Sequence, residues 1–524
     1  MSRWQAQALS TIADSAEFLV LNCSKTPSRR QPVKHALYYA LNLICLKSPW
    51  TRQVPVPLGL AIRNVVDFEA EVEGAWQRLP HHVLGQIKRH GPDCLIKFGM
   101  GLLRMPSSAP PILSYHHGDP RSFRGRPAGF YELLSARPAI GQVIQTLTDR
   151  LDAGTIVAFA ETKAYAHSYK RTMMEAFSRS PLLLKSAIEM CVANKLLPLE
   201  PTGKNYTLPR NSVVLKFAAG LLAAKIRRLF YGLFIEKQWE VAEAEVDAKP
   251  ADKETFPVGL PERSKWTIVQ RPSRYRFVAD PFPHPAGGLL VEALRRSDEQ
   301  GEILHIDASG ERTICTGPGH FSYPATIEVD DRHYLIPEIA EWSSPRLYAL
   351  ETGGAKKAVS LNLSTSWRIL DPTLYRAEAG LFSLFGNRAD EGPDVLRLWT
   401  SPDLFGQFEE HPASPIRISP LGSRMAGSVL RSGGTLYRLG QDCSRGYGDG
   451  LIAFSIERLT TTEYSEAEAG RLKFADLNGP HTLNCEGGHC LFDFYTEQVS
   501  ALAGARRIRA LISKRRARRT VPTT

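Results

Sequence analysis

The sequence lacks the residue patterns that mark zinc-binding, secreted and membrane-spanning proteins. Its eight cysteines are scattered among apolar neighbours, and none belongs to a Cys-x-x-Cys pair. Structural zinc sites use closely spaced pairs of cysteine or histidine, so we expect no metal site. The chain has no cleavable signal peptide and no apolar run long enough to span a bilayer. These absences favour a cytoplasmic protein.

Acidic residues are absent from the last stretch of the chain, residues 501–524, which carries eight lysines and arginines. Most of the net charge of +11 therefore lies in this short stretch. The concentration of charge at one end argues against a specific nucleic-acid partner. We interpret residues 501–524 as a basic tail, which is either a solvated end or a contact with an anionic membrane surface. The second alternative would place the protein at the periphery of the inner membrane.

The length and composition indicate a globular protein with more than one domain. The chain has 524 residues, of which 43% are hydrophobic and 23% are charged. Helical patterns alternate with short apolar strands over residues 1–235, whereas strands and turns fill residues 266–500. An acidic, proline-containing stretch separates the two regions. We predict an α/β domain over 1–235, a linker over 236–265, an all-β domain over 266–500 and the basic tail.

A histidine and an aspartate in the first half form a candidate catalytic couple. A short apolar strand ends at His116, an Arg124-Gly125 pair follows it, and Asp152 lies in a Leu-Asp-x-Gly turn. A His–Asp couple can polarise an attacking amine and stabilise the imidazolium that forms. The alternation of helices and strands indicates a parallel sheet, in which ligands gather at the carboxyl ends of strands. We therefore expect a site around His116.

This segment resembles the formyltransferase family, whose members move a formyl group from 10-formyltetrahydrofolate to an amine. The resemblance implies a Rossmann-like domain, with a folate as cofactor, His116 as general base and Asp152 orienting it. Ser114 stands where the family has its catalytic asparagine. The structural alternative is that His116 only makes a hydrogen bond and that Asp152 only caps its turn. The residues that the resemblance places near the folate are Gly99, Met100, Arg124 and Gly125.

The beginning of the chain departs from this family. The family opens with a strand before a helix of the Trp-Gln-Ala type, and this chain starts at Met1, already in that helix. A missing central strand would leave the backbone groups of its neighbours unpaired. We therefore expect that the true start codon lies upstream and that the first strand is missing from this sequence.

Residues 213–234 form a long apolar stretch that is interrupted by lysines and arginines. These charges argue against a membrane span. We predict a packed helix between the domains, and the alternative is a helix that lies on a membrane surface.

The second half contains five similar segments. Each has a turn-like entry, a short strand, a turn and a second strand rich in leucine, phenylalanine and tyrosine. The entries are 43, 48, 55 and 53 residues apart, a spacing typical of propeller blades. We predict a five-bladed β-propeller. The entry residues are Pro281, Pro324, Pro372, Gly427 and Pro480.

Acidic residues recur near the predicted axis of this propeller. The region resembles the five-bladed glycoside hydrolases, and more closely the N-terminal domain of plant glucosamine inositolphosphorylceramide transferases. The resemblance rests on motifs such as Ala-Asp-Pro-Phe from Ala279 and Asp-Pro-Thr from Asp371. It implies a carbohydrate partner, with Tyr323 and His320 nearby as a stacking face and a polar contact. The acids expected to bind the sugar are Asp280, Glu338, Asp371 and Asp442, with Glu292 beside them.

Three functions fit these observations. The first is formyl transfer to an amino sugar in surface glycan biosynthesis, with the propeller holding the carbohydrate. The second is a glycoside hydrolase or a glycosyltransferase-associated propeller protein whose formyltransferase-like domain is degenerate. The third is a non-catalytic glycan-binding protein. The register of His116 and Asp152 with the formyltransferases favours the first.

Overall fold

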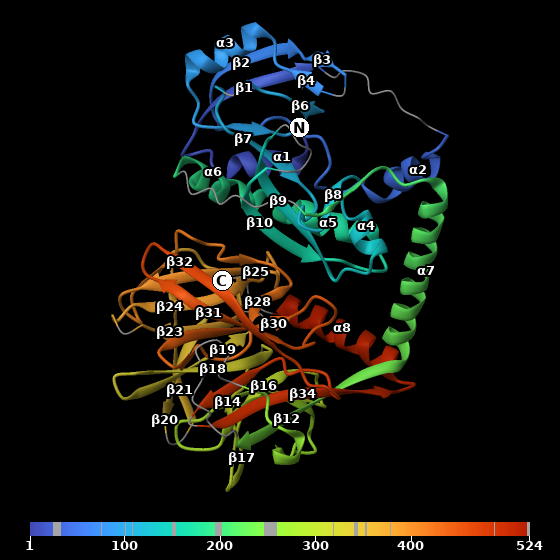
Figure 1. The fold of residues 1–524 in the computed structure, drawn as a ribbon. Coiled ribbons are helices and arrows are strands. Elements are labelled where there is room, and N and C mark those ends of the chain that lie inside the picture. The colour runs from blue at the N-terminus through green and yellow to red at the C-terminus, as the bar shows by residue number, and fades with distance from the viewer. Residues whose placement is uncertain are drawn as a thin grey trace. The chain divides into compact units, whose positions relative to one another are not determined.

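The computed structural model divides the chain into two compact units, Met1–Arg228 and Leu229–Thr524. Figure 1 shows both units, and each is described by itself below. No helix within the described part of the chain is both long and apolar enough to cross a membrane. The described residues are 1–24, 33–74, 76–99, 101–106, 108–148, 154–193, 202–245, 259–317, 319–339, 344–351, 354–377, 379–486 and 488–520.

The main sheet of the first unit has four strands in the order β10-β9-β7-β5. Only β5 and β7 pair in parallel, whereas β9 pairs antiparallel with both β7 and β10. The prediction of a parallel sheet is therefore wrong for β9, which runs opposite to the other three strands. A short connection joins β9 to β10 as a hairpin. The four strands are β5 (Leu95–Lys97), β7 (Ile112–His116), β9 (Ala139–Thr146) and β10 (Ile156–Lys163).

The remaining strands of the first unit form small separate sheets. One sheet pairs β1 with β2 in parallel, one pairs β8 with β11, and one joins β3, β4 and β6. Their bounds are β1 (Glu17–Ser24), β2 (Ala61–Glu69), β3 (Glu71–Glu73), β4 (Trp76–Arg78), β6 (Leu102–Leu103), β8 (Phe123–Gly125) and β11 (Lys204–Tyr206).

Helices of the first unit pack around an aromatic core. Phe130 stacks on Phe217 with ring centroids 4.2 Å apart, and Tyr169 lies edge-on to both rings. Phe217 belongs to the long helix α7, whose later residues are largely exposed. The helices are α1 (Arg3–Ser10), α2 (Ala36–Cys45), α3 (His81–His90), α4 (Phe130–Leu134), α5 (Tyr169–Arg179), η1 (Ser180–Leu183), α6 (Leu184–Val192) and α7 (Asn211–Phe234).

The second unit is a ring of five sheets, as the repeats predict, and their strands pair antiparallel except for β22 with β26 in the third sheet. The first four sheets follow one another along the chain. The first contains β14 (Tyr275–Pro283), β15 (Leu289–Arg295), β16 (Gly301–Asp307) and β17 (Gly310–Cys315). The second contains β18 (Phe321–Val329), β19 (Arg332–Ile339), β20 (Arg346–Glu351) and β21 (Gly354–Ser360). The third contains β22 (Asn362–Leu363), β23 (Ile369–Arg376), β24 (Phe382–Arg388), β25 (Val395–Ser401), β26 (Gln407–Glu410) and β27 (Arg417–Ile418). The fourth contains β28 (Leu421–Met425), β29 (Leu430–Ser432), β30 (Thr435–Asp442), β31 (Leu451–Leu459) and β32 (Tyr464–Leu472).

The fifth sheet closes the ring with strands from both ends of the unit. Its order is β13-β12-β34-β33, and β12 pairs with β34 along its whole length. The predicted linker is therefore wrong at its start, where residues 235–245 form β12. The acidic residues of this segment suggested a linker, but the strand buries Trp239, Val241, Ala242 and Ala244. The strands are β12 (Ile235–Glu245), β13 (Thr267–Ile268), β33 (Leu483–Glu486) and β34 (His489–Val499), with η2 (Arg263–Lys265) between β12 and β13.

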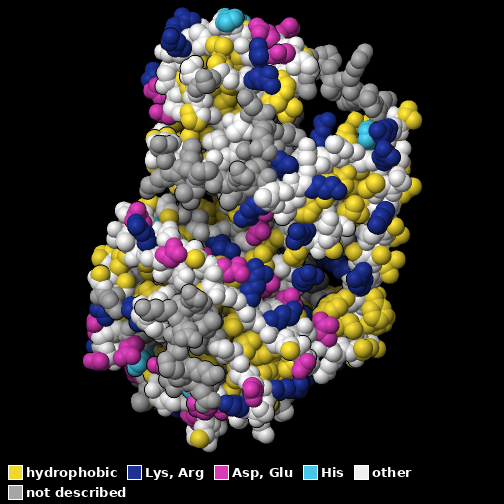
Figure 2. Space-filling model, viewed as in Figure 1, with side chains coloured by type: hydrophobic (Ala, Val, Ile, Leu, Met, Phe, Trp, Pro, Cys, Tyr) yellow, Lys and Arg dark blue, Asp and Glu magenta, His cyan; other side chains and the backbone are white. Residues whose placement is uncertain are grey.

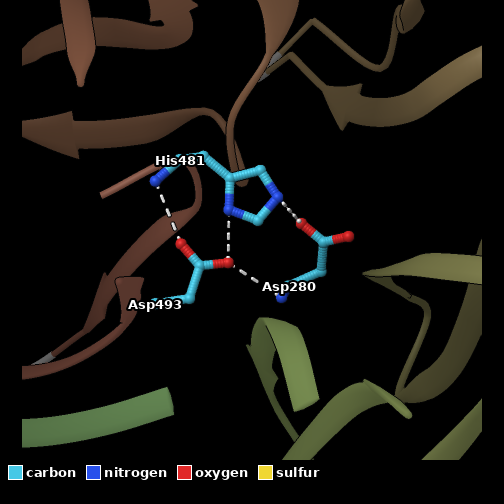
Figure 3. A group of neighbouring side chains, drawn as sticks. All are labelled: Asp280, His481 and Asp493. Carbon is cyan, nitrogen blue, oxygen red and sulfur yellow. Dashed lines mark hydrogen bonds and ion pairs between the residues drawn. The ribbon is translucent and has the colours of Figure 1, made fainter. Parts of the chain in front are cut away.

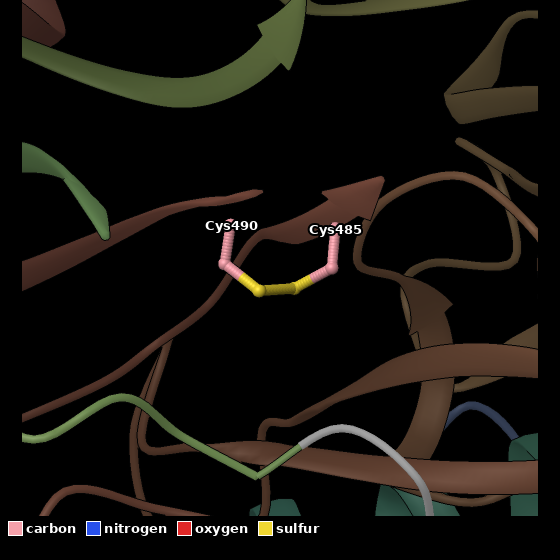
Figure 4. Close-up of a disulfide and its surroundings, with 2 residues drawn as sticks. All are labelled: Cys485 and Cys490. Atoms are coloured by element: carbon pink, nitrogen blue, oxygen red, sulfur yellow. A yellow bond between two sulfur atoms is a disulfide. The ribbon is translucent and has the colours of Figure 1, made fainter. Parts of the chain in front are cut away.

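A disulfide joins the two C-terminal strands of the fifth sheet. Cys485 of β33 and Cys490 of β34 are direct cross-strand partners, with Cα atoms 4.1 Å apart (Figure 4). The disulfide cross-links the hairpin formed by β33 and β34, the last two strands of the ring.

Candidate functional site

His116 ends β7 in the first unit, as predicted, and it is half-buried. Its Nε2 atom lies 3.4 Å from the backbone oxygen of Phe123. Ser114 lies on the same strand and pairs with Lys97 and Gln145 on the neighbouring strands. The predicted partner Asp152 and the predicted folate contact Met100 lie outside the described residues. The His–Asp couple therefore stays a prediction.

Two of the predicted folate contacts have partners in a small sheet. Arg124 donates from Nε to the backbone oxygen of Gly203 at 2.7 Å. Gly125 has φ of 85°, and a side chain there would collide with the backbone oxygen of Tyr206. These contacts join β8 to β11 and account for both residues without a ligand. Gly99 is exposed, with open space where a Cβ atom would lie.

The neighbouring His117 has a structural role that the sequence did not suggest. Its Nε2 atom lies 2.8 Å from Ser180 Oγ, and its ring packs edge-on to Trp4 and Phe177. Burial, with a smaller effect of His116, lowers the pKa of His117 to about 3. The ring is therefore neutral at physiological pH.

The main polar cluster of the protein lies in the propeller, where charged side chains from three sheets meet. Arg424 of β28 makes a bidentate contact with Asp371 of β23, and its Nη2 atom lies 3.5 Å from Glu338 Oε2 of β19. Glu338 accepts a hydrogen bond from the Asp371 backbone nitrogen at 3.1 Å. Gln441 donates to Asp371 at 3.2 Å. We call Glu338, Asp371, Arg424 and Gln441 the arginine cluster.

The charges of the arginine cluster are nearly removed from water. Glu338 and Asp371 are buried, and the Arg424 side chain is 17% exposed. Burial and the neighbouring Asp371 raise the pKa of Glu338, and Arg424 opposes this rise. Buried carboxylates are costly unless they are paired, and here one guanidinium contacts both. The cluster therefore depends on Arg424.

A second cluster places a histidine between two aspartates (Figure 3). His481 precedes β33, and its Nδ1 atom lies 2.5 Å from Asp493 Oδ2 while its Nε2 atom lies 3.2 Å from Asp280 Oδ1. Asp493 also accepts hydrogen bonds from the backbone nitrogens of His481, Thr482 and Asp280. We call Asp280, His481 and Asp493 the histidine cluster. The histidine cluster joins the first blade to the fifth and so stabilises the closed ring of blades.

Ionisation in the histidine cluster is set by the proximity of its members. Burial alone would lower the pKa of His481, but the carboxylates of Asp493 and Asp280 raise it to about 9. Burial raises the pKa of Asp280, with contributions from Glu292 and Asp493, while His481 opposes the rise. An imidazolium between two acids therefore supplies the positive charge that the site needs.

The histidine cluster has the composition of a cation site. One ligand atom from each of its three residues lies within 4.8 Å of the other two. A metal ion would need a neutral imidazole with a free lone pair, whereas both ring nitrogens of His481 lie at ion-pair distance from carboxylates. The protonated histidine and a bound cation are thus mutually exclusive.

Backbone strain marks the entries of the first three blades. Asp280, Tyr323 and Asp371 have φ of 50°, 47° and 45°, and each precedes a proline. The strand pairing shifts register at the same three points. Non-glycine residues held in this region cost about 1–3 kcal/mol each, and such residues cluster at functional sites. The repeat found in the sequence therefore corresponds to a repeated bulge that turns the entry side chains of these strands.

Two of the predicted sugar contacts have other roles. Tyr323 is fully buried, and its hydroxyl lies 3.0 Å from Thr373 Oγ1 and accepts from the Gly427 backbone nitrogen at 2.9 Å. It therefore offers no face for stacking, because its ring is part of the core. His320 accepts from the Gly301 backbone nitrogen, and its other ring nitrogen lies 3.1 Å from Glu292.

Asp442 takes no described part in either cluster. Its carboxylate accepts hydrogen bonds from the backbone nitrogen and the hydroxyl of Ser444, at 2.9 and 2.6 Å. These contacts form a local turn at the end of β30. The structure thus brings Glu338 and Asp371 together through Arg424, and places Asp280 with His481.

The sequence analysis assigned no role to several residues of the site. Its repeated segments contain all of them, but nothing in the segments marks them as partners of the acids: Arg424, Gln441, His481 and Asp493. Tyr447 lies in the loop after β30, with Arg424 5.2 Å from its ring centroid and the His481 ring also 5.2 Å away. The residue as a whole is 42% exposed, whereas burial of its hydroxyl raises the pKa of that group well above its ordinary value. Tyr447 therefore lies next to both clusters with part of its surface open to solvent.

The loop that carries Tyr447 is held by a close approach at Gly448. This residue has φ of 70°, and a Cβ atom there would lie 2.5 Å from the Trp239 ring and 3.0 Å from His481 Cβ. Lys237 donates to the Tyr447 backbone oxygen at 2.7 Å. Strand β12 thus supplies both residues that position this loop.

Comparison with known proteins points to the same region. Residues 305–491 match the family defined by the N-terminal part of glucosamine inositolphosphorylceramide transferase 1. The protein of that name from Oryza sativa subsp. japonica is 29% identical over 255 residues, which cover 45% of this chain and 34% of the relative. The chain thus spans about a third of the length of this curated relative.

Two solved structures are similar over parts of the chain. A GH43_1 enzyme from Xanthomonas citri complexed with xylotriose has a TM-score of 0.30 and 13% identity, and the match covers 39% of this chain and 78% of that one. A Mycobacterium tuberculosis protein described as a candidate sugar N-formyltransferase has a TM-score of 0.23 and 14% identity, over 36% and 75%. Similarity at this level carries no argument about activity.

Proposed function

We propose that the propeller binds a carbohydrate and that the protein acts in the assembly of a glycan or glycolipid. The observation that carries this proposal is the convergence of two buried charged clusters beside Tyr447, a residue that is 42% exposed. Buried charges that only stabilise a fold can often be replaced by apolar residues without loss. The arginine cluster and the histidine cluster lie close together in the propeller, and this concentration of buried charge favours a ligand with many hydroxyl groups.

The chemistry of the site suits a sugar. Carboxylates accept hydrogen bonds and a guanidinium donates them, so Asp371 and Arg424 together match hydroxyls that do both. The Tyr447 ring can cover the apolar face of a pyranose, since an aromatic side chain offers an apolar body with a polar tip. The side chains of Asp371, Arg424 and Tyr447 are therefore sufficient in kind to recognise a sugar.

The comparisons support a carbohydrate role over formyl transfer. The matched segment contains the whole arginine cluster, Tyr447 and His481. The relatives carry the name glucosamine inositolphosphorylceramide transferase 1. An amino sugar or a sphingolipid-linked glycan is accordingly the substrate class that we propose. This proposal corresponds to the second of the three functions that fit the sequence, a propeller protein associated with a glycosyltransferase.

Recognition is favoured over hydrolysis by the contacts of the acids. Glycosidases use two carboxyl groups that flank the scissile bond, one of which donates a proton. Here Asp371 and Glu338 share Arg424, and Asp280 is paired with His481. Formyl transfer by His116 of the first unit remains a separate proposal, with 10-formyltetrahydrofolate as its cofactor.

Calorimetric titration of the full chain with amino-sugar and pentose oligomers tests the proposal. We expect binding by wild type and at least about tenfold weaker binding by Asp371→Asn, because hydrogen bonds to a charged group contribute about 1.5–3 kcal/mol. Cleavage products that are lost in Asp280→Asn would instead indicate hydrolysis. A parallel titration with 10-formyltetrahydrofolate, using His116→Ala as the control, examines the first unit. Failure of every sugar to bind would overturn the carbohydrate role.

A further inference from the structure

The second unit carries a fixed corner where α7 ends and the C-terminal helix α8 (Ala503–Thr520) begins. Arg507 of α8 donates to the backbone oxygens of Tyr231 and Gly232, in the last turn of α7, and of Ile235, the first residue of β12. The last four carbonyls of a helix have no partner inside the helix, so the guanidinium caps α7. Gly504 lets α8 approach, because a Cβ atom there would lie 3.2 Å from Leu233 Cδ2. The two helix ends are thus held together.

Apolar side chains are exposed around this corner. On α7 they recur with a spacing that places them on one side of the helix, and on α8 two of them are four residues apart. Their exposed fractions range from 39% to 81%. Scattered exposed apolar residues are ordinary, but a contiguous group marks an interaction surface. We call these residues the apolar corner: Leu229, Phe230, Leu233, Phe234, Val499, Leu502, Ile508 and Ile512.

The apolar corner is bordered by positive charge. Figure 2 shows apolar side chains beside lysine and arginine side chains around the lower end of α7. Arg509 is exposed on α8, and the sequence of the same helix adds five more lysines and arginines up to residue 519 without an acid. Arg506 and Arg507 are already engaged with Glu236 and the end of α7.

The exposed apolar side chains and the positive charge beside them distinguish between two partners, a second copy of the chain and an anionic bilayer. A second copy of the chain would place one basic helix against another in a symmetric contact, and the like charges would repel. An anionic bilayer offers an acyl interior for the apolar side chains and headgroup charge for the arginines. We infer that the apolar corner and α8 dock the propeller on an anionic membrane surface. The surface does not depend on the residues proposed to bind the sugar.

Sedimentation of the full chain with lipid vesicles tests this inference. We expect binding to vesicles of equal parts phosphatidylcholine and phosphatidylserine, and little binding to phosphatidylcholine alone. Added salt should weaken the binding, since it screens the charge contribution. Phe230→Ser, which removes a ring that is 56% exposed, should weaken binding at least about tenfold. Arg509→Glu should weaken it by a similar factor.

The control is Phe405→Ser, because Phe405 is 54% exposed elsewhere in the propeller. It should bind vesicles like wild type, and thermal melting should show that all three variants are folded. Absence of wild-type binding to the mixed vesicles, or unchanged binding by both Phe230→Ser and Arg509→Glu, would overturn the inference. Self-association that Phe230→Ser abolishes would also overturn it, by assigning the apolar corner to a second copy.

Discussion

At the scale of single residues, Arg424 holds the site together. It is the shared partner of two buried carboxylates, and neither Glu338 nor Asp371 has a second cation among its described contacts. The sequence analysis found both acids because each belongs to a motif of the repeat. Arg424 also lies in a repeated segment, but its pairing with acids of other blades cannot be seen in local sequence.

Arg424→Met should destabilise the propeller by about 3–5 kcal/mol, since it leaves two buried acids without their cation. Arg458→Met is a matched control, because the Arg458–Glu463 pair lies on the surface and should cost about 1 kcal/mol or less. Denaturant unfolding of both variants measures the difference. Equal effects of the two substitutions would show that the arginine cluster is not an essential part of the fold.

His481 should make stability depend on pH. Its pKa is raised from 6.5 to about 9 in the folded protein, so the folded state holds the proton more tightly than the unfolded state. The resulting stabilisation is complete below pH 6.5 and is lost as pH rises through 9. The free energy of unfolding should fall across this window by at most about 1.4 kcal/mol per pH unit. Urea unfolding of wild type and His481→Gln checks this, and the variant should show a flatter profile. Identical slopes would contradict the assigned charge state.

Gly448→Ala should displace the loop of Tyr447. The added Cβ atom would meet the Trp239 ring, and φ of 70° is strained for alanine, so we expect a loss of about 1–3 kcal/mol. Gly446→Ala is the control, because Gly446 has open space around it and no positive φ. Thermal melting and sugar titration of both variants measure the effect. If both glycines tolerate alanine equally, the close approach does not position Tyr447.

At the scale of elements, the repeat in the sequence predicted the blades well, and the failures have physical causes. The prolines at 281, 324 and 372 mark strained entry residues, which is why a one-dimensional pattern located them. Strand β12 was missed because its partner β34 lies more than 240 residues further along the chain. In the first unit, the expectation of a parallel sheet failed at β9, which runs antiparallel to both of its neighbours. Pairing over long separations and strand direction both depend on contacts that composition does not encode.

Strand β12 should be needed for a stable propeller. A fragment from Leu229 to the C-terminus retains β12, whereas a fragment from Trp266 leaves the edge of β34 unpaired and removes Trp239 from its contact with His481. The shorter fragment should lose well over about 3 kcal/mol, the cost of deleting one large core side chain. Circular dichroism melts compare the two, and a synthetic peptide of residues 229–245 should restore stability. Equal melting temperatures would show that the ring closes without β12.

At the scale of the whole molecule, a propeller with two buried ionic clusters is joined in one chain to an α/β unit with a strand-end histidine. The spacing of the repeats predicted the fold class of the second unit. For its function, the sequence indicated only that the ligand is a carbohydrate. The first unit's catalytic couple was predicted from a family resemblance, and Asp152 lies outside the described residues. The central claim therefore rests on the propeller.

Titration of the full chain with glucosamine-terminated oligosaccharides tests that claim most directly, when wild type, Tyr447→Ala and Phe405→Ala are compared by calorimetry. Tyr447 is exposed, so its replacement should leave the fold intact, and the loss of a stacking face should weaken binding about tenfold or more. Phe405→Ala removes the ring of a similarly exposed residue that belongs to neither cluster, and it should bind like wild type. Unchanged affinity in Tyr447→Ala, with folded protein in all three samples, would contradict sugar binding at the two clusters of the propeller.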